Sequence, residues 1–291
     1  MLPCLVNERK GDIMDKLKLM KLANEIRKDI VVSVHSAKAG HPGGSLSAAE
    51  LFTYLYFEEL NIDPKDPAKP DRDRFVLSKG HTAPGLYAAL AERGFFPKED
   101  LPTLRHVGSY LQGHPDMKSV PGVDMSSGSL GQGISAAVGM ALAAKIYGDD
   151  YRVYTLLGDG EIQEGQVWEA AMLAAHHNLD NLVVIVDNNN LQIDGEIDKV
   201  NSPYPIDEKF EAFRFHVINI DGNDFDQIDA AFKEAKTVKG QPTAIIAKTM
   251  KGKGVSFMEN NADWHGKAPN DEEFEIAMED LKKEGEALCQ M

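Results

Sequence analysis

The stretch "YRVYTLLGDGEIQEG" (residues 151–165) decides the fold of this chain. It begins with an apolar run that is too short for a helix, and this run ends in an aspartate held between two glycines. A carboxylate-rich segment of helical character follows. A short buried strand that leads through a glycine turn into a helix is typical of proteins built on a parallel β-sheet.

The same alternation of short apolar runs and helical segments extends along the chain. Strands are expected at 74–78, 151–157, 181–186, 216–220 and 243–248. Helices are expected at 15–38, 46–59, 84–94, 131–147, 164–177, 226–237 and 271–290. The pattern predicts an α/β fold, with a mainly parallel sheet and helices on both faces. We expect a single domain over residues 13–291 after an N-terminal tail at 1–12, with the proline-containing stretch 61–73 as a surface connection.

Composition limits the classes of function. The 291 residues carry a net charge of −15 without a cluster of Lys and Arg, which argues against a nucleic-acid surface. No apolar stretch reaches the roughly 18 residues that span a membrane, and the N-terminus lacks the apolar core of a signal peptide. Cys4 and Cys289 show neither CxxC spacing nor a disulfide framework. We therefore expect a cytoplasmic protein that binds neither nucleic acid nor membrane.

Asp159 stands where parallel sheets bind ligands, at the carboxyl end of a strand and before a helix. Gly158, Gly160 and Gly165 nearly match the dinucleotide fingerprint, but that motif requires a neutral residue between its first two glycines. An acid repels a diphosphate unless a divalent cation lies between them, and Mg²⁺ is usually held by one or two carboxylates and by phosphate oxygens. Asp159 therefore predicts a metal ion, with a carboxylate that faces the ligand and supports no core.

Further oxygen ligands follow the next expected strand, in "VDNNNLQIDG" (186–195). Between Gly160 and Asn188 lie 27 residues, enough for one helix and one strand, so the two strand ends should be neighbours. Asparagine side-chain oxygens and a backbone carbonyl within 189–191 can complete a coordination shell without adding charge. Alone, a run of asparagines is typical of a turn. Together with Asp159 at this spacing, it indicates a metal site.

These motifs resemble a known family. "GDG", 27 residues and "NN" resemble the thiamin-diphosphate-binding motif. The N-terminal domain of transketolases is similar in six stretches that include "GHPGGS", "RDRFVLSKGH", "GHPD", "GSLGQGISAAVGMA" and "WHGKAP", from about residue 17 to about 285. The resemblance implies the thiamin-diphosphate-binding fold of the diphosphate-binding (PP) type.

Metal and cofactor ligands follow from this resemblance. It implies that Asp159, Asn189 and the backbone carbonyl of Leu191 bind Mg²⁺ or Ca²⁺ together with the diphosphate of thiamin diphosphate. Ser129 replaces the proline usual in the family, and Asn188 stands where an acid often occurs, but both changes leave the metal ligands intact.

Four histidines are also assigned by the resemblance. A lone loop histidine is usually a surface residue, but His41, His81, His114 and His265 all stand beside glycine or proline. Ketol transfer needs neutral donors and bases that exchange protons near pH 7, and histidine serves as both. The resemblance implies catalytic positions for His41 and His114 near the donor substrate, and for His81 and His265 near diphosphate and substrate. The other five are expected to be structural or surface residues: His35, His106, His176, His177 and His216.

The glycine turn before the expected helix 131–147 has two interpretations. Gly128, Leu130 and Gly131 either allow tight helix packing or, by the resemblance, approach the aminopyrimidine ring and the diphosphate. Glu164 either contributes favourable charge to the first turn of a helix or, by the resemblance, lies near a dimer interface between cofactor sites. The resemblance thus gives this cofactor-binding set: His81, Gly128, Leu130, Gly158, Asp159, Gly160, Glu164, Asn189 and His265.

The resemblance also implies a partner chain. In transketolases, the glutamate that activates the cofactor and the aromatic residues that hold its pyrimidine ring belong to a second, C-terminal domain. We expect the N-terminal subunit of a split transketolase that is active only with a pyrimidine-binding subunit, in a two-plus-two complex. It would transfer a two-carbon ketol unit from a ketose phosphate to an aldose phosphate, as in the pentose phosphate pathway. Three alternatives remain open: the alpha subunit of a 2-oxoacid dehydrogenase first component, a non-catalytic cofactor-binding subunit, and a nicotinamide-dependent dehydrogenase.

Overall fold

A five-stranded parallel sheet forms the centre of the computed structural model, which describes residues 14–291. The expected tail at 1–12 lies outside the described residues. In spatial order the strands are β1 (Arg74–Leu77), β2 (Val153–Gly158), β3 (Leu182–Asn188), β7 (Thr243–Lys248) and β6 (His216–Asp221), and each pair is parallel. All five strands coincide with the predicted apolar runs to within two residues. Nearly continuous apolar sequence therefore corresponds to burial on both faces.

Six long helices confirm the predicted helical segments. They are α1 (Lys16–Ala37), α4 (Ala83–Arg93), α5 (Gln132–Tyr147), α6 (Gly165–His176), α9 (Phe225–Thr237) and α10 (Asp271–Cys289). Helix α10 begins with a capping box, in which the side chains of Asn270 and Glu273 each accept a hydrogen bond from the other's backbone N–H. Among residues 14–291, no helix is long and apolar enough to cross a membrane.

The predicted helix at 46–59 is wrong as a single element. The chain forms α2 (Pro42–Ser47), then α3 (Ala49–Tyr54) and a π-helical turn (Leu55–Glu59), with a break at Ala48, where φ is −97° and ψ is 9°. The Ser47 hydroxyl, just before the break, donates to the Gly44 carbonyl and to Asp187. Such side-chain bonds compete with the helix ladder, and here they direct α2 toward the ends of the strands.

Short elements between β3 and β6 were not predicted. They comprise a hairpin of β4 (Leu191–Gln192) and β5 (Gly195–Glu196), followed by α7 (Ile197–Asn201) and α8 (Ile206–Ala212). Strands of two residues and helices of five and seven residues are too short to produce a readable period.

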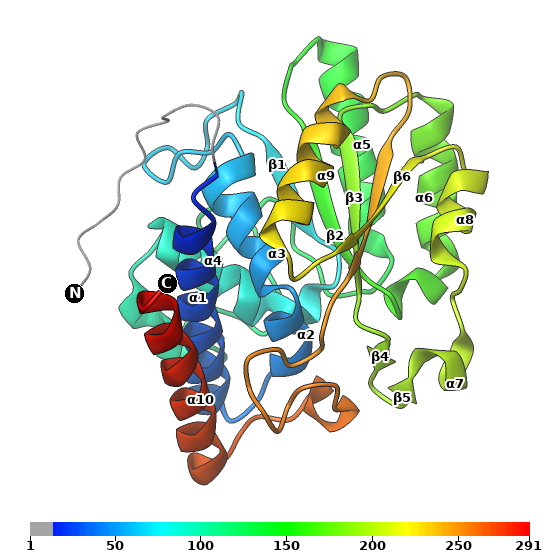
Figure 1. Cartoon of the computed structure of the whole chain (residues 1–291). Coiled ribbons are helices and arrows are strands. Elements are labelled where there is room, and N and C mark those ends of the chain that lie inside the picture. The colour runs from blue at the N-terminus through cyan, green and yellow to red at the C-terminus, as the bar shows by residue number, and fades with distance from the viewer. Residues whose placement is uncertain (1–13) are drawn as a thin grey trace.

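Two hydrophobic cores cover opposite faces of the sheet, which confirms the predicted layers. Along β3, Val183 and Ile185 belong to one core, whereas Val184 and Val186 belong to the other. The first core includes residues of α1, α3, α4 and α9, and the second includes residues of α5, α6 and α8. Helix α10 packs along α1 on the outside of the first layer (Figure 1).

The carboxyl ends of β2, β3 and β7 meet at one edge of the sheet. The register pairs Gly158 with Asp187, and Asn188 with Lys248. The loops that leave these strands are therefore neighbours, as the spacing of the two motifs predicts. Helix α2 and the β4–β5 hairpin lie at this end of the sheet (Figure 1).

Candidate functional site

Asp159 follows β2, and its side chain is only 2% exposed. Its Oδ1 accepts a hydrogen bond from the Gly160 N–H (2.8 Å), and its Oδ2 accepts one from the Asn190 N–H (2.6 Å). Burial, followed by the nearby charge of Asp187, raises the pKa of Asp159 to about 7. Within residues 14–291 no Lys or Arg forms a direct ion pair with this carboxylate, and its two hydrogen bonds come from backbone N–H groups.

The other two predicted metal ligands lie in the loop that Asp159 contacts. The Asn189 side chain donates through Nδ2 to Asp187 (3.0 Å), while its Oδ1 accepts the Leu191 N–H (3.2 Å). The Leu191 carbonyl accepts a hydrogen bond from Lys251 Nζ (2.9 Å). Both acceptor oxygens can take a further ligand, because each oxygen has two lone pairs.

This donor set fits a hard divalent cation shared with a phosphate. It offers one carboxylate, one amide oxygen and one carbonyl, and Mg²⁺ typically completes such a shell with water and phosphate oxygens. Among residues 14–291, no group of three or more His, Cys, Asp and Glu side chains could hold a metal by itself. The metal role of Asp159, Asn189 and Leu191 therefore remains a prediction that the arrangement fits.

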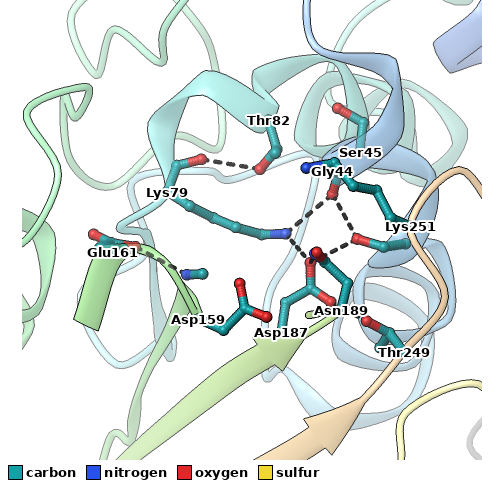
Figure 2. A network of polar contacts seen from close by, with 12 residues as sticks. Gly44, Ser45, Lys79, Thr82, Asp159, Glu161, Asp187, Asn189, Thr249 and Lys251 are labelled. Atoms are coloured by element: carbon teal, nitrogen blue, oxygen red, sulfur yellow. Dashed lines mark hydrogen bonds and ion pairs between the residues drawn. The ribbon is translucent and has the colours of Figure 1, made fainter. Parts of the chain in front are cut away.

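A second buried acid, Asp187, supports the loop and is 0% exposed. Its carboxylate accepts hydrogen bonds from four side chains: Ser47, Lys79, Asn189 and Thr249. Burial alone would raise the pKa of Asp187, but the Lys79 ammonium and these donors hold it below its usual range. Figure 2 shows the Lys79 side chain reaching toward Asp187 and Gly44. Because Asp187 takes the Nδ2 side of the Asn189 amide, the Oδ1 side remains for a ligand.

Lys251 belongs to the site although no predicted motif includes it. Its side chain is 1% exposed, and Nζ lies 2.8 Å from His265 Nδ1 as well as against the Leu191 carbonyl. Burial lowers the pKa of Lys251 to about 8, while Asp159 and Asp187 oppose this shift. The available sequence signal was its place in "TMKGKG", immediately after a strand that ends beside β3.

Three of the four predicted histidines form one cluster. The ring centroids of His41 and His81 are 5.1 Å apart, those of His81 and His265 are 5.1 Å apart, and those of His41 and His265 are 5.6 Å apart. Burial, reinforced by nearby cations, lowers the pKa of His41 to about 4 and of His265 to about 3, and lowers the pKa of His81 well below its usual range. All three rings are neutral at pH 7. His41 Nδ1 is buried and has no hydrogen-bond partner among the described residues.

His114 lies against the glycine turn. A Cβ at Gly128 would lie 3.0 Å from His114 Cδ2, and the Gly128 backbone has a φ of 153°. Gly131 has a φ of 81°, so both glycines have backbone conformations that other residues rarely adopt. Burial, followed by Arg105, lowers the pKa of His114. Leu130, between the two glycines, is exposed.

The remaining predicted cofactor residues lie in or beside the metal loop, the name used here for the two neighbouring segments 158–160 and 188–191. A Cβ at Gly160 would lie 3.1 Å from the Gln192 Oε1, and the Gly158 N–H donates to Glu161 (3.0 Å). Glu164 is the exposed N-cap residue of α6, beside the glycine turn, where a Cβ at Gly131 would lie 2.8 Å from its Cβ. Glu164 therefore lies outside the metal loop.

The five other histidines lie away from this site, as predicted. His35 bonds Asp271 and His216 bonds Glu234, both at the surface. His106 contacts the Ser36 carbonyl, and His176 and His177 are exposed at the end of α6.

The fold and the site define an α/β protein with buried carboxylate, amide and carbonyl oxygens at parallel strand ends, beside neutral histidines, which is where such sheets bind ligands. The family described as "Transketolase, thiamine diphosphate binding domain" matches residues 19–286. The chain therefore belongs to the transketolase family and represents its thiamine diphosphate binding domain. This confirms the family and the fold that the sequence motifs predict.

Individual relatives extend this result. The 6-deoxy-6-sulfo-D-fructose transketolase subunit SqwG of Clostridium sp. (strain MSTE9) is 46% identical over 270 residues, which cover 93% of this chain and 98% of that protein. One subunit of the apulose-4-phosphate transketolase of Actinobacillus succinogenes is 45% identical and covers 91% of this chain and 96% of that protein.

Solved structures give the same fold. A transketolase from Campylobacter jejuni superposes with a TM-score of 0.87 and 34% identity, covering 94% of this chain and 46% of that one. The chain thus spans less than half of the solved transketolase but nearly all of the two relatives that are themselves subunits. Neither a nicotinamide-dependent dehydrogenase nor a 2-oxoacid dehydrogenase subunit is favoured.

Proposed function

We propose that this chain is the diphosphate-binding subunit of a two-chain transketolase, which transfers a two-carbon ketol unit between sugar phosphates. One observation carries the proposal: the Asn190 N–H donates a hydrogen bond to Asp159, and this bond joins the loops that follow β2 and β3. These loops bring together the oxygens of Asp159, Asn189 and Leu191. Lys251 and the neutral His265 lie beside them. When bound, thiamin diphosphate supplies the carbanion chemistry, and the protein positions the reactants.

In this proposal the metal ion with its protein ligands and the Lys251 ammonium group both bind the diphosphate. Asp159, Asn189 and the Leu191 carbonyl hold Mg²⁺ or Ca²⁺, which neutralises the repulsion between the carboxylate and the phosphates. Lys251 adds a buried ammonium group beside the same carbonyl. Gly158 and Gly160, together with Gly128 and Leu130 on the opposite loop, allow the cofactor to approach the backbone closely.

The histidines act as neutral donors and acceptors. His265 accepts a hydrogen bond from Lys251 at Nδ1, so its proton is on Nε2 and can be donated to an anionic or hydroxyl oxygen. His81 lies in the same cluster and also donates a hydrogen bond to an anionic or hydroxyl oxygen. His41, with an unpaired Nδ1, and His114 bind hydroxyl groups of the donor sugar. Depressed pKa values keep His41, His81 and His265 uncharged at neutral pH.

An exposed apolar face supports the association with a partner. Five large apolar residues on or beside α5 and α6 are between 38% and 80% exposed: Leu130, Ile146, Tyr147, Met172 and Leu173. Extended exposed apolar surface is typical of interaction sites, and obligate interfaces bury on the order of 2,000 Å² or more. We assign this face to a two-plus-two complex with a C-terminal, pyrimidine-binding subunit, and we take residues 13–291 as one domain. Both relatives that match along their whole length are named as subunits.

The substrate class is a ketose that carries an anionic group. One relative is named for a sulfo-fructose and the other for apulose-4-phosphate, and the two are similarly related to this chain. The donor proposed from this class is a ketose phosphate. The proposed acceptor is an aldose phosphate, and both belong to the pentose phosphate pathway. A cytoplasmic location is part of the proposal, supported by the cysteine spacing.

Reconstitution tests the proposal. The purified chain, with Mg²⁺ and thiamin diphosphate, should show no ketol transfer from xylulose 5-phosphate to ribose 5-phosphate, and adding the partner subunit should produce it. A thermal-shift series should show stabilisation by thiamin diphosphate only with Mg²⁺ present, and none by NAD. Turnover by the single chain would contradict the assignment to a two-chain enzyme. Stabilisation by NAD alone would contradict the assignment of thiamin diphosphate as the cofactor.

A further inference from the structure

We propose that Glu161 is a positioning residue that fastens the glycine turn 128–131 to the metal loop, and thereby sets the affinity for the cofactor. This inference rests on the proposed function, because it takes the two loops as opposite walls of the thiamin diphosphate site. It concerns a residue that has no ligand role in the proposal above.

The Glu161 carboxylate joins three chain segments. It is buried in the 3₁₀ turn Glu161–Gln163, directly after the metal loop. Its Oε1 accepts hydrogen bonds from the Ser78 hydroxyl (2.5 Å) and from the Gly131 N–H (2.9 Å), and its Oε2 accepts the Gly158 N–H (3.0 Å). In the view of Figure 2, Glu161 lies on the side of Asp159 opposite Asp187 and Asn189. The carboxylate therefore links the ends of β1 and β2 to the glycine turn.

In the part of the chain that the structure describes, Glu161 is the one side chain that accepts a backbone N–H at the start of α5. Gly131 is the N-cap residue of α5, and its own side chain cannot accept the free N–H groups of the first turn. Glu161 accepts the N–H of Gly131 itself, and a carboxylate at this end of α5 is also favoured by the dipole of the helix. Glu161 thus holds the backbone at the N-cap of α5.

Close packing makes the turn sensitive to this contact. A Cβ at Gly80 would lie 2.7 Å from the Gly128 nitrogen, and a Cβ at Gly133 would lie 2.6 Å from Ser78 Cα. The backbones thus touch without intervening side chains, and close-packed contacts transmit small displacements. Loss of the Glu161 contact would change the distance between the glycine turn and the metal loop.

Only a carboxylate of this length satisfies all three donors. A glutamine at this position has one acceptor oxygen and one NH₂ group. Whichever way its amide is turned, the NH₂ group faces the N–H of either Gly131 or Gly158, so one of these two hydrogen bonds is lost. The Ser78 hydroxyl is the dispensable donor, because its removal leaves the hydrogen bonds from the Gly131 and Gly158 N–H groups in place.

Two measurements on the full-length chain test the inference. In the absence of cofactor, hydrogen exchange of Glu161→Gln should show loss of protection in peptides that cover Gly131 or Gly158, with the rest of the sheet unchanged. Calorimetric titration with thiamin diphosphate at saturating Mg²⁺ should show an affinity about tenfold weaker, the size expected for one lost buried hydrogen bond. Ser78→Ala is the matched control and should bind within about twofold of wild type.

The outcomes separate this inference from the proposed function. Wild-type protein that fails to bind thiamin diphosphate with Mg²⁺ would overturn both. Wild-type binding combined with unchanged affinity or unchanged exchange in Glu161→Gln would overturn the positioning role alone. If Glu161→Gln does not fold, Glu161→Asp decides the matter: it keeps the charge but is one methylene shorter, and it should show the same loss of protection at Gly131. With the partner present, half-maximal activity should require more cofactor, while the rate at saturating cofactor stays within about twofold.

Discussion

Lys251 Nζ lies 2.8 Å from His265 Nδ1, and the same ammonium lies 2.9 Å from the carbonyl oxygen of Leu191. A lysine ammonium can only donate, so the imidazole accepts at Nδ1 and carries its proton on Nε2. This contact connects the predicted metal loop with the histidine cluster and sets the tautomer of one of its members.

Lys251→Met should weaken the binding of thiamin diphosphate by at least about tenfold, because it removes a buried, charged hydrogen-bond donor. The substitution keeps most of the apolar stem, so the fold should persist. Calorimetry in saturating Mg²⁺ measures the effect. Lys248→Met is the control, since Lys248 is exposed at the end of β7. Equal affinities of the two variants would show that Lys251 serves the fold and not the cofactor.

Asp159→Asn should abolish Mg²⁺-dependent binding of thiamin diphosphate, with an affinity at least about a hundredfold weaker, because Asp159 is the one carboxylate among the three proposed metal ligands. The amide also places an NH₂ group against the N–H of Asn190 or Gly160, so the loop itself is destabilised. The expectation that this carboxylate supports no core stays a prediction, and the two hydrogen bonds that it accepts are local to the loops. Asp194→Asn, at the exposed tip of the β4–β5 hairpin, should bind as wild type does. Retained Mg²⁺-dependent affinity in Asp159→Asn would refute the metal assignment.

The stability of wild type relative to His41→Gln should fall as the pH is lowered from about 6.5 to about 4. The folded-state pKa of His41 is about 4, whereas an unfolded histidine has a pKa of about 6.5. Between these values the unfolded chain binds more protons, so this histidine favours unfolding increasingly as the pH falls. Urea unfolding of both proteins at several pH values measures the difference.

Asp159 should produce a slope of the opposite sign. Its folded-state pKa of about 7 lies above the ordinary value, so the folded protein binds the extra proton as the pH falls from about 7 to about 4. Wild type should therefore gain stability relative to Asp159→Asn over this range. His176→Gln, at an exposed position on α6, is the control substitution for the histidine experiment. A flat difference between wild type and His41→Gln would mean that the His41 ring is solvated in the folded protein.

Met172→Glu should weaken association with the partner chain by at least about a hundredfold, because it places a charge on the exposed apolar face. Thermal stability of the isolated chain should change little, since Met172 is 62% exposed. Sedimentation analysis of mixtures with the partner measures the complex. Ile276→Glu on α10, also an exposed apolar residue, is the matched control and should assemble normally. If both variants assembled equally well, the interface would lie elsewhere.

The sequence by itself determined the parallel sheet, the long helices and the family. Strands such as β3 are continuous apolar runs, and their short length and the turn residues around them distinguish them from helices without knowledge of the tertiary contacts. The spacing from Gly160 to Asn188 was sufficient to make two loops neighbours, because one helix and one strand return the chain to the same edge of the sheet. Asp159 and the asparagine run could be proposed for the same reason, whereas the roles of Asn189 and of the four loop histidines followed from the resemblance to transketolases.

Only the tertiary structure decided which charged residues are buried at this edge. Lysines are mostly exposed, and the places of Lys79 and Lys251 just after strands do not show that they are buried while Lys248 is exposed. Their burial depends on Asp187 and Leu191, which lie more than fifty residues away along the chain. The break at Ala48 has the same origin, because the Ser47 hydroxyl bonds Asp187 across the sheet edge. Burial of a charge is a property of its distant partners, and those partners meet only when the strands have paired.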